Sequence, residues 1–143
     1  MGLLVYSNIA AINSKLTYNK SEKLKSRKAI DLLFAKGIGI SAFPIKVLYN
    51  YSEDQKANLQ AGVTASSRHF KKAVDRNRIK RVLREAYRLQ KLPLQNQLLE
   101  QNKRMVLFFI YIGKELPNFE DVYKKMGSVL HQLINNLSNQ PKA

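Results

Sequence analysis

The sequence predicts an α+β protein, a two-layer α/β sandwich in which helices cover a small sheet. Residues 43–51 and 105–112 have the patterns of strands, whereas residues 26–37, 71–91 and 118–137 repeat their apolar side chains at helical spacing. The 143 residues suffice for one domain with a real core. The expected order is helix, strand, strand, helix, strand, helix, with room for an extra short strand.

The expected domain covers residues 21–138, between an N-terminal extension (1–20) and a short tail (139–143). The first twenty residues show no clear periodicity, so we expect at least Met1 to Asn13 to be poorly ordered. A secretory signal is not expected, because no basic residue precedes the early apolar residues. No apolar run is long enough to span a bilayer, so no membrane partner is expected.

The first expected helix follows Ser26, whose hydroxyl is suited to cap its first turn. Ile30, Leu33 and Phe34 share one face, and Gly37 favours the end of the helix.

Two strands are expected next, over residues 43–51 and from Leu59 onward. Apolar and polar residues alternate in both segments, and Pro44 favours a strand start or a sheet edge. Because a polar turn separates them, we predict that the two strands form a hairpin. The residues sharing one face of the first strand are Phe43, Ile45, Val47, Tyr49 and Tyr51.

The next expected helix is basic and is bounded by a proline. Ser66 and Ser67 are candidate caps before it, and Pro93 limits it. The Gln/Asn-rich stretch 94–102 is expected to be a loop, with at most a short helical continuation.

The last two elements are a buried strand and an amphipathic helix. Residues 105–112, MVLFFIYI, are apolar throughout, which is typical of a central strand. Asn118 is a candidate cap for the final helix, whose apolar stripe comprises Val122, Met126, Val129, Leu130, Leu133, Ile134 and Leu137.

The positive charge of the chain is concentrated on the basic helix. The sequence has 25 Lys and Arg against 10 Asp and Glu, a net charge of +15. Ten of those cations lie between Arg68 and Lys91, against only Asp75 and Glu85. At about 100° per residue, the cations gather opposite an apolar arc, with Glu85 placed to pair with Arg81 or Arg78. Such a face favours a polyanionic partner, and Asn77 adds an amide that can bond a base edge or a 2′-hydroxyl.

The sequence offers no converging catalytic or metal-binding set. There are no cysteines, and His69 and His131 lie in different elements without a third residue at triad or metal spacing. We therefore expect no catalytic residue and no metal ligand in the protein. We expect His69 to join the basic cluster and His131 to lie on the surface.

The run KKAVDRNRIKRVLREAYR, residues 71–88, resembles the signature helix of the bacterial ribonuclease P protein component family. The order of elements on both sides matches the family as well, from about Lys23 to Leu137. The matching motif residues are Ala73, Val74, Arg76, Asn77, Arg78, Lys80, Arg81 and Arg84.

The resemblance implies a fold similar to a domain of a small-subunit ribosomal protein, with an uncommon left-handed βαβ crossover. It also implies a function: the protein subunit of ribonuclease P binds a catalytic RNA and the 5′ leader of precursor tRNA. The RNA, with Mg²⁺ bound mainly by that RNA, then cleaves the phosphodiester bond. The expected partners are therefore ribonuclease P RNA and precursor tRNA, in the cytoplasm, with no obligate protein partner.

Two groups of site residues follow from the resemblance and the charge pattern. In the family, the leader lies in a cleft between the sheet and the first helix, where aromatic rings stack unpaired bases. Ile30, Phe34 and Tyr49 would line that cleft, with Lys80 near its rim, although their spacing equally fits a core. The residues expected to bind the RNA are Arg68, Lys71, Lys72, Arg76, Asn77, Arg78, Lys80, Arg81, Arg84 and Arg88.

This chain departs from the family pattern at three places. Lys71 stands where the family usually has Gly, and Arg68 follows Ser67 where the family often has Lys. Ile30 occupies a position often filled by Phe, which would remove one stacking surface.

Other functions remain open from the residues alone. A ribosomal or other structured-RNA-binding protein without enzymatic activity would explain the charge and the fold. A DNA-binding helix-turn-helix fits less well, since residues 71–91 contain no turn signal. A membrane-surface helix is weaker still, because the apolar arc lacks Trp and Phe.

Overall fold

The structure, a computed structural model, describes residue 18, residues 20–52 and residues 57–139. Its elements in chain order are η1 (Lys20–Glu22), α2 (Arg27–Lys36), β1 (Ile38–Ala42), β2 (Ile45–Tyr51), β3 (Leu59–Ala65), α3 (Ala73–Gln90), α4 (Leu92–Glu100), β4 (Met105–Tyr111) and α5 (Phe119–Asn139).

The ends of the domain differ slightly from the expected boundaries. Tyr18 already packs edge-on against Tyr87 of α3, at 5.7 Å between ring centroids, and η1 begins at Lys20. The fold therefore starts before residue 21. The expected disorder of Met1 to Asn13 falls outside the described residues, as do residues 140–143 of the expected tail.

The four strands form one mixed sheet in the order β1-β2-β4-β3. β4 lies in the middle, antiparallel to β2 and parallel to β3. Its uninterrupted apolar sequence is explained by this position, because both of its faces are covered. The prediction of a buried central strand is confirmed.

The predicted hairpin between residues 43–51 and 59–65 is wrong. β4 separates β2 from β3, and the antiparallel partner of β2 on its other side is β1. The expected first strand also divides: Phe43 and Pro44 form a two-residue turn between β1 and β2, with Ala42 paired to Ile45. The extra short strand is therefore β1.

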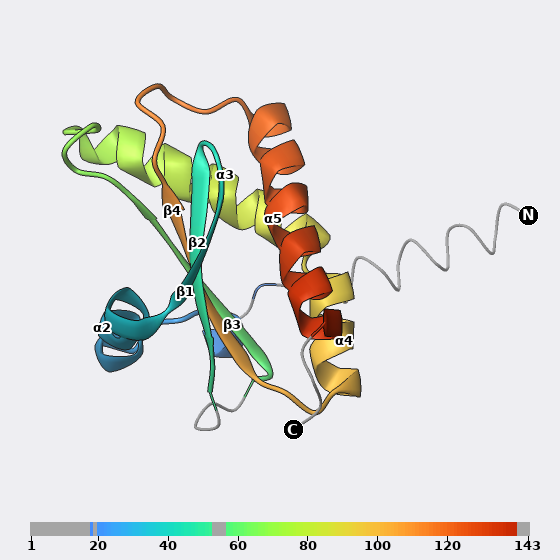
Figure 1. The fold of residues 1–143 in the computed structure, drawn as a ribbon. Coiled ribbons are helices and arrows are strands. Elements are labelled where there is room, and N and C mark those ends of the chain that lie inside the picture. Colours follow the sequence, from blue (N-terminus) through green and yellow to red (C-terminus); the bar gives the residue numbers. More distant parts are fainter. Residues whose placement is uncertain (1–17, 19, 53–56, 140–143) are drawn as a thin grey trace, which may run out of the picture.

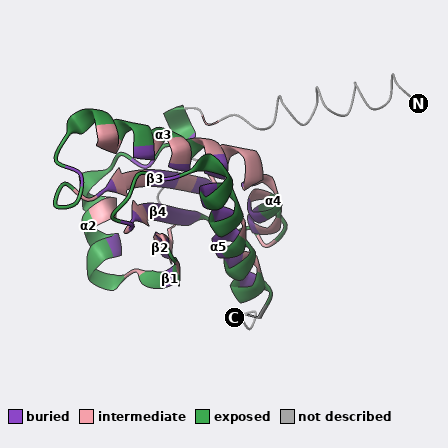
Figure 2. Ribbon diagram, turned by 90° about the horizontal axis from the view of Figure 1, so that it is seen from above, coloured by how far each residue is buried: buried purple, intermediate pink, exposed green. Residues whose placement is uncertain are grey.

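Helices lie on both faces of the sheet, as Figure 1 shows. On one face, α3, α4 and α5 close a large core around side chains such as Val47, Leu107 and Phe109. On the other face, α2 packs through Leu33 over a small cluster with Leu48 and Phe108. In Figure 2 the strands are mostly buried, whereas the outer sides of the helices are exposed.

The connection from β3 to β4 runs through α3 and α4. Both helices contribute to the large core, and the two strands they connect are parallel neighbours. This is a βαβ crossover. Residues 94–102, expected mainly as a loop, are largely helical and belong to α4. Pro93 lies in the first turn of α4, where a helix tolerates proline.

The ends of α2 and α5 match their predicted caps. The Ser26 hydroxyl accepts a hydrogen bond from the Ala29 amide at 3.2 Å, and Gly37 follows the last turn of α2. The Asn118 side chain accepts from the Glu120 amide at 2.8 Å at the start of α5. Local polar chemistry therefore determines where these two helices begin.

A buried ion pair holds η1 against the junction of α3 and α4. Lys91 donates to the Glu22 carboxylate, and the Lys91 side chain is only 1% exposed. Lys91 belongs to the cations counted on the basic segment, but it is part of the interior. No described helix is both long enough and apolar enough to cross a membrane.

Candidate nucleic-acid interface

The basic helix α3 is amphipathic, as its sequence predicts. Ile79, Leu83 and Ala86 are fully buried against the sheet and α5. The opposite face carries side chains that remain exposed and form no hydrogen bond or ion pair with other described residues: Asn77, Arg78, Arg81 and Arg84. Since guanidinium groups bind phosphate through paired N–H donors, this face is suited to a nucleic-acid backbone.

Arg76 stabilises the start of the helix. The predicted caps Ser66 and Ser67 do not cap α3, because the helix begins at Ala73 and Lys72 is its N-cap residue without a side-chain hydrogen bond. Instead, Arg76 Nη1 donates to the carbonyls of Phe70 (2.7 Å) and Lys71 (2.8 Å). Arg76 therefore orders the basic loop before the helix, a role that its position in the motif does not reveal.

Glu85 pairs with Arg88, not with Arg81 or Arg78. Two hydrogen bonds, of 2.6 and 3.1 Å, join the Arg88 guanidinium to the Glu85 carboxylate. These bonds are the main reason why the pKa of Glu85 lies below its usual range. Arg88 is thereby partly neutralised, and Arg81 is left available to a ligand.

A hollow of about 370 Å³ lies on the basic face of α3. It is lined by Tyr18 together with Asn77, Arg81, Arg84, Glu85 and Arg88. The Tyr18 hydroxyl donates to the carbonyl of Ala61, and burial raises the pKa of Tyr18 to about 12. Sequence reasoning missed Tyr18, because this residue lies outside the periodic part of the chain.

The loop before α3 extends the cationic surface. Arg68, Lys71 and Lys72 are all exposed, and so is His69. The Ser66 hydroxyl accepts from the Arg68 amide at 3.2 Å, which shapes the loop rather than the helix. The expected basic cluster is therefore continuous from this loop onto the helix.

Two of the expected leader-binding residues lie together on α2. Phe34 is 58% exposed and contacts Phe108 of β4 edge-to-face, with ring centroids 5.6 Å apart. Ile30 is half-buried against the same small cluster. An exposed ring resting on a packed apolar base can stack an unpaired base.

Tyr49 does not lie beside them. Strand residues alternate between faces, and Leu48 is the residue of this pair that points toward α2. Tyr49 is buried in the large core, and its hydroxyl accepts a hydrogen bond from Asn136 of α5 at 3.3 Å. Placing Tyr49 on the leader surface is therefore wrong. Lys80 is half-buried on α3, and its place at the rim stays a prediction.

The histidines and carboxylates of the described residues are scattered. His131 is exposed on α5, as expected. Within the described ranges, no three His, Cys, Asp or Glu side chains are grouped so that they could hold a metal ion.

Comparison with known proteins gives a single consistent family. The ribonuclease P family model matches residues 18–134. The ribonuclease P protein component of Porphyromonas gingivalis (strain ATCC 33277) is 33% identical over 120 residues, covering 83% of this chain and 88% of the relative. That of Chlorobaculum tepidum is 30% identical over 131 residues, covering 85% and 83%.

The fold agrees with this result. The structure of the Staphylococcus aureus RNase P protein superimposes with a TM-score of 0.63 at 17% identity, covering 80% of this chain and 96% of that one. Because the family match spans the first helix, the whole sheet, the basic helix and most of α5, the chain belongs to the ribonuclease P protein family.

Proposed function

We propose that this chain acts as the protein subunit of ribonuclease P by binding the catalytic RNA through the outer face of α3. The observation that carries the proposal is the row of exposed, unpaired Asn77, Arg78, Arg81 and Arg84 on one rigid helix. Long-range attraction to phosphates and short bidentate hydrogen bonds act together on such a face.

The proposal assigns the chemical step to the RNA. Mg²⁺ bound mainly by that RNA would supply Lewis-acid chemistry for cleavage of the phosphodiester bond. The protein positions the substrate: the surface of α2 around Phe34 contacts the single-stranded leader of precursor tRNA, and α3 fixes the protein on the RNA. The complex forms in the cytoplasm, where its proposed RNA partners are made.

The decisive assay measures cleavage of precursor tRNA by a bacterial ribonuclease P RNA at low Mg²⁺, with and without this protein. We expect the protein to increase the rate of leader removal. No increase at saturating protein would refute the proposed function, and copurification of ribosomal RNA would favour a ribosomal role.

A pair of variants assigns the effect to α3. Arg81→Ala combined with Arg84→Ala removes two exposed cations. The double variant should bind the RNA at least about tenfold more weakly, because each lost phosphate contact no longer releases counterions from the RNA. The slope of log affinity against log salt should fall by roughly two. Arg104→Ala, an exposed cation ahead of β4, is the matched control.

A further inference from the structure

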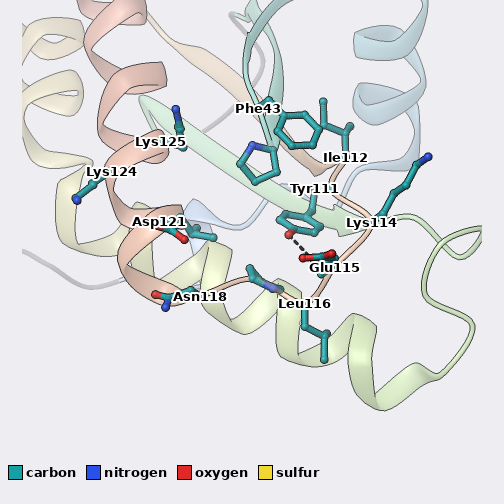
Figure 3. A pocket seen from close by; sticks show the side chains of 14 residues that line it. Phe43, Tyr111, Ile112, Lys114, Glu115, Leu116, Asn118, Asp121, Lys124 and Lys125 are labelled. Atoms are coloured by element: carbon teal, nitrogen blue, oxygen red, sulfur yellow. Dashed lines mark hydrogen bonds between the residues drawn. The ribbon is translucent and has the colours of Figure 1, made fainter.

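A second hollow lies at the end of the sheet, away from both α2 and the outer face of α3. It has a volume of about 760 Å³ and lies between the turn joining β1 and β2, the loop from β4 to α5, and the first turns of α5. This size is within the range of small-ligand pockets. Figure 3 shows its lining residues converging from these three segments.

The floor of this hollow is tightly built. Gly113 is buried, and a Cβ atom at this position would lie 2.7 Å from the Tyr111 hydroxyl and 3.0 Å from Pro44. The Tyr111 hydroxyl donates to the Glu115 carbonyl at 2.6 Å, which holds the loop in place. The Ile112 amide donates to the Pro44 carbonyl at 2.8 Å, which joins the loop to the turn.

The walls combine an exposed ring with cations. Phe43 is 66% exposed at the tip of the turn, so its ring is open to a ligand. Figure 3 shows Lys114 on one side of the hollow and Lys124 and Lys125 on the other, from α5. Among the lining residues, these three lysines outnumber the carboxylates of Glu115 and Asp121.

One ring of the basic loop before α3 contacts a residue that lines the hollow. The ring of Phe70, which lies between Arg68 and Lys71, contacts the Tyr111 ring with centroids 5.9 Å apart. The exposed cations Arg68 and Lys71 on either side of Phe70 therefore belong to a loop that packs against the wall of the hollow.

We propose that this hollow binds one unpaired nucleotide of the RNA held by α3, with its base against Phe43 and Ile112 and its phosphates near Lys114, Lys124 and Lys125. The inference rests on the proposed function, since the RNA supplies the nucleotide. Aromatic and apolar surface edged by lysines is the combination that binds single-stranded nucleic acid, because rings stack bases and ammonium groups hold phosphates. An acidic peptide would satisfy the lysines but would leave the Phe43 ring without a flat partner.

The direct test is titration of the ¹⁵N-labelled full chain with AMP, UMP, inorganic phosphate and a peptide of four glutamates, followed by NMR. Both nucleotides should shift the amides of Ile112, Gly113 and Lys125 at millimolar concentration, and phosphate should do so less. Equal shifts with phosphate, stronger shifts with the peptide, or no shift with the nucleotides would each overturn the proposal.

A matched pair of variants tests the stacking ring in a longer ligand. Phe43→Ala should weaken binding of a ten-nucleotide oligouridylate by about tenfold, the loss typical of one stacked base. Phe119→Ala removes an exposed ring of α5 that does not line the hollow, and should leave the affinity unchanged. Equal affinities of the two variants would overturn the proposal, with circular dichroism showing that both are folded.

This experiment can fail independently of the proposed function. The nucleotides and the oligouridylate require no ribonuclease P RNA, whereas the cleavage assay does. If the protein stimulates cleavage but nucleotides cause no amide shifts at the hollow, only the nucleotide site is refuted. If nucleotides do cause these shifts but the protein does not stimulate cleavage, only the role as a ribonuclease P subunit is refuted.

Discussion

The two faces of the sheet differ in how completely helices close them. On the face of α3, α4 and α5, Leu107 and Phe109 are 0% exposed. On the face of α2, that ten-residue helix and Leu24 cover the strands and leave Phe34 58% exposed. The first face can supply most of the hydrophobic free energy of folding, whereas the second retains apolar surface that a ligand can cover.

The largest expected effect is on the free energy of unfolding, and it should differ between substitutions at two neighbouring residues of β4. Phe109→Ala opens a cavity in the large core and should lower the free energy of unfolding by about 4 kcal/mol. Phe108→Ala, which removes a ring from the α2 face, should cost about half as much, because its surroundings are more open. Urea denaturation followed by circular dichroism measures both, and equal losses would contradict the contrast between the faces.

The ion pair beside the large core should have the next largest effect. Lys91→Met leaves the Glu22 carboxylate buried without its cation, which should destabilise the fold by about 3 kcal/mol. Adding Glu22→Gln to that variant should restore part of the loss. Lys25→Met, at an exposed position, is the control, and a change within about 0.5 kcal/mol for both lysine variants would contradict the role of the pair.

On the α2 face, the effect should appear in binding rather than in stability. Phe34→Ala should change the free energy of unfolding by less than about 1 kcal/mol, because the ring is largely exposed. The same variant should weaken binding of precursor tRNA to the assembled enzyme by about tenfold, through loss of a stacking ring. Leu32→Ala removes an apolar side chain from another side of α2, and binding of mature tRNA is the second control. If Leu32→Ala had the same effect as Phe34→Ala, α2 would contribute only general apolar surface.

The smallest expected effect is a dependence on pH at the edge of the large core. Burial raises the pKa of Tyr18 from 10.0 to about 12 in the folded chain, so the unfolded chain loses this proton first as the pH rises. The contribution of Tyr18 to stability is therefore complete below pH 10 and is lost between pH 10 and pH 12. Tyr18→Phe should flatten the decline in stability over this interval without abolishing it, because burial also raises the pKa of Tyr87. Identical pH profiles for both proteins would contradict this assignment.

Most elements were predictable where the local sequence determines the structure. Ser26 and Asn118 cap helices through their own side chains, and the apolar run of β4 has no suitable place except the middle of the sheet. The basic helix follows from its periodicity alone. In each case a short segment contains the whole physical cause.

Other features were not predictable because their causes lie far away in the sequence. Alternation shows that residues 43–51 and 59–65 are strands, but it does not show that β4 inserts between them. Alternation also separates Tyr49 from Leu48 without indicating which of them points toward α2. The place of the extra short strand, β1, was not predictable because its five residues include a glycine and show no clear alternation. The hydrogen bonds from Arg76 to the preceding loop depend on a backbone geometry that the motif does not indicate.

The central place of β4 has a consequence for synthesis of the protein. During translation, β2 and β3 leave the ribosome before the strand that joins them, so neither can complete its sheet pairing until Tyr111 has been added. The nascent chain therefore carries open strand edges through the synthesis of α3 and α4, and the MVLFFIY segment then emerges uncharged and strongly apolar. Such a chain should depend on chaperones to reach the folded state in good yield.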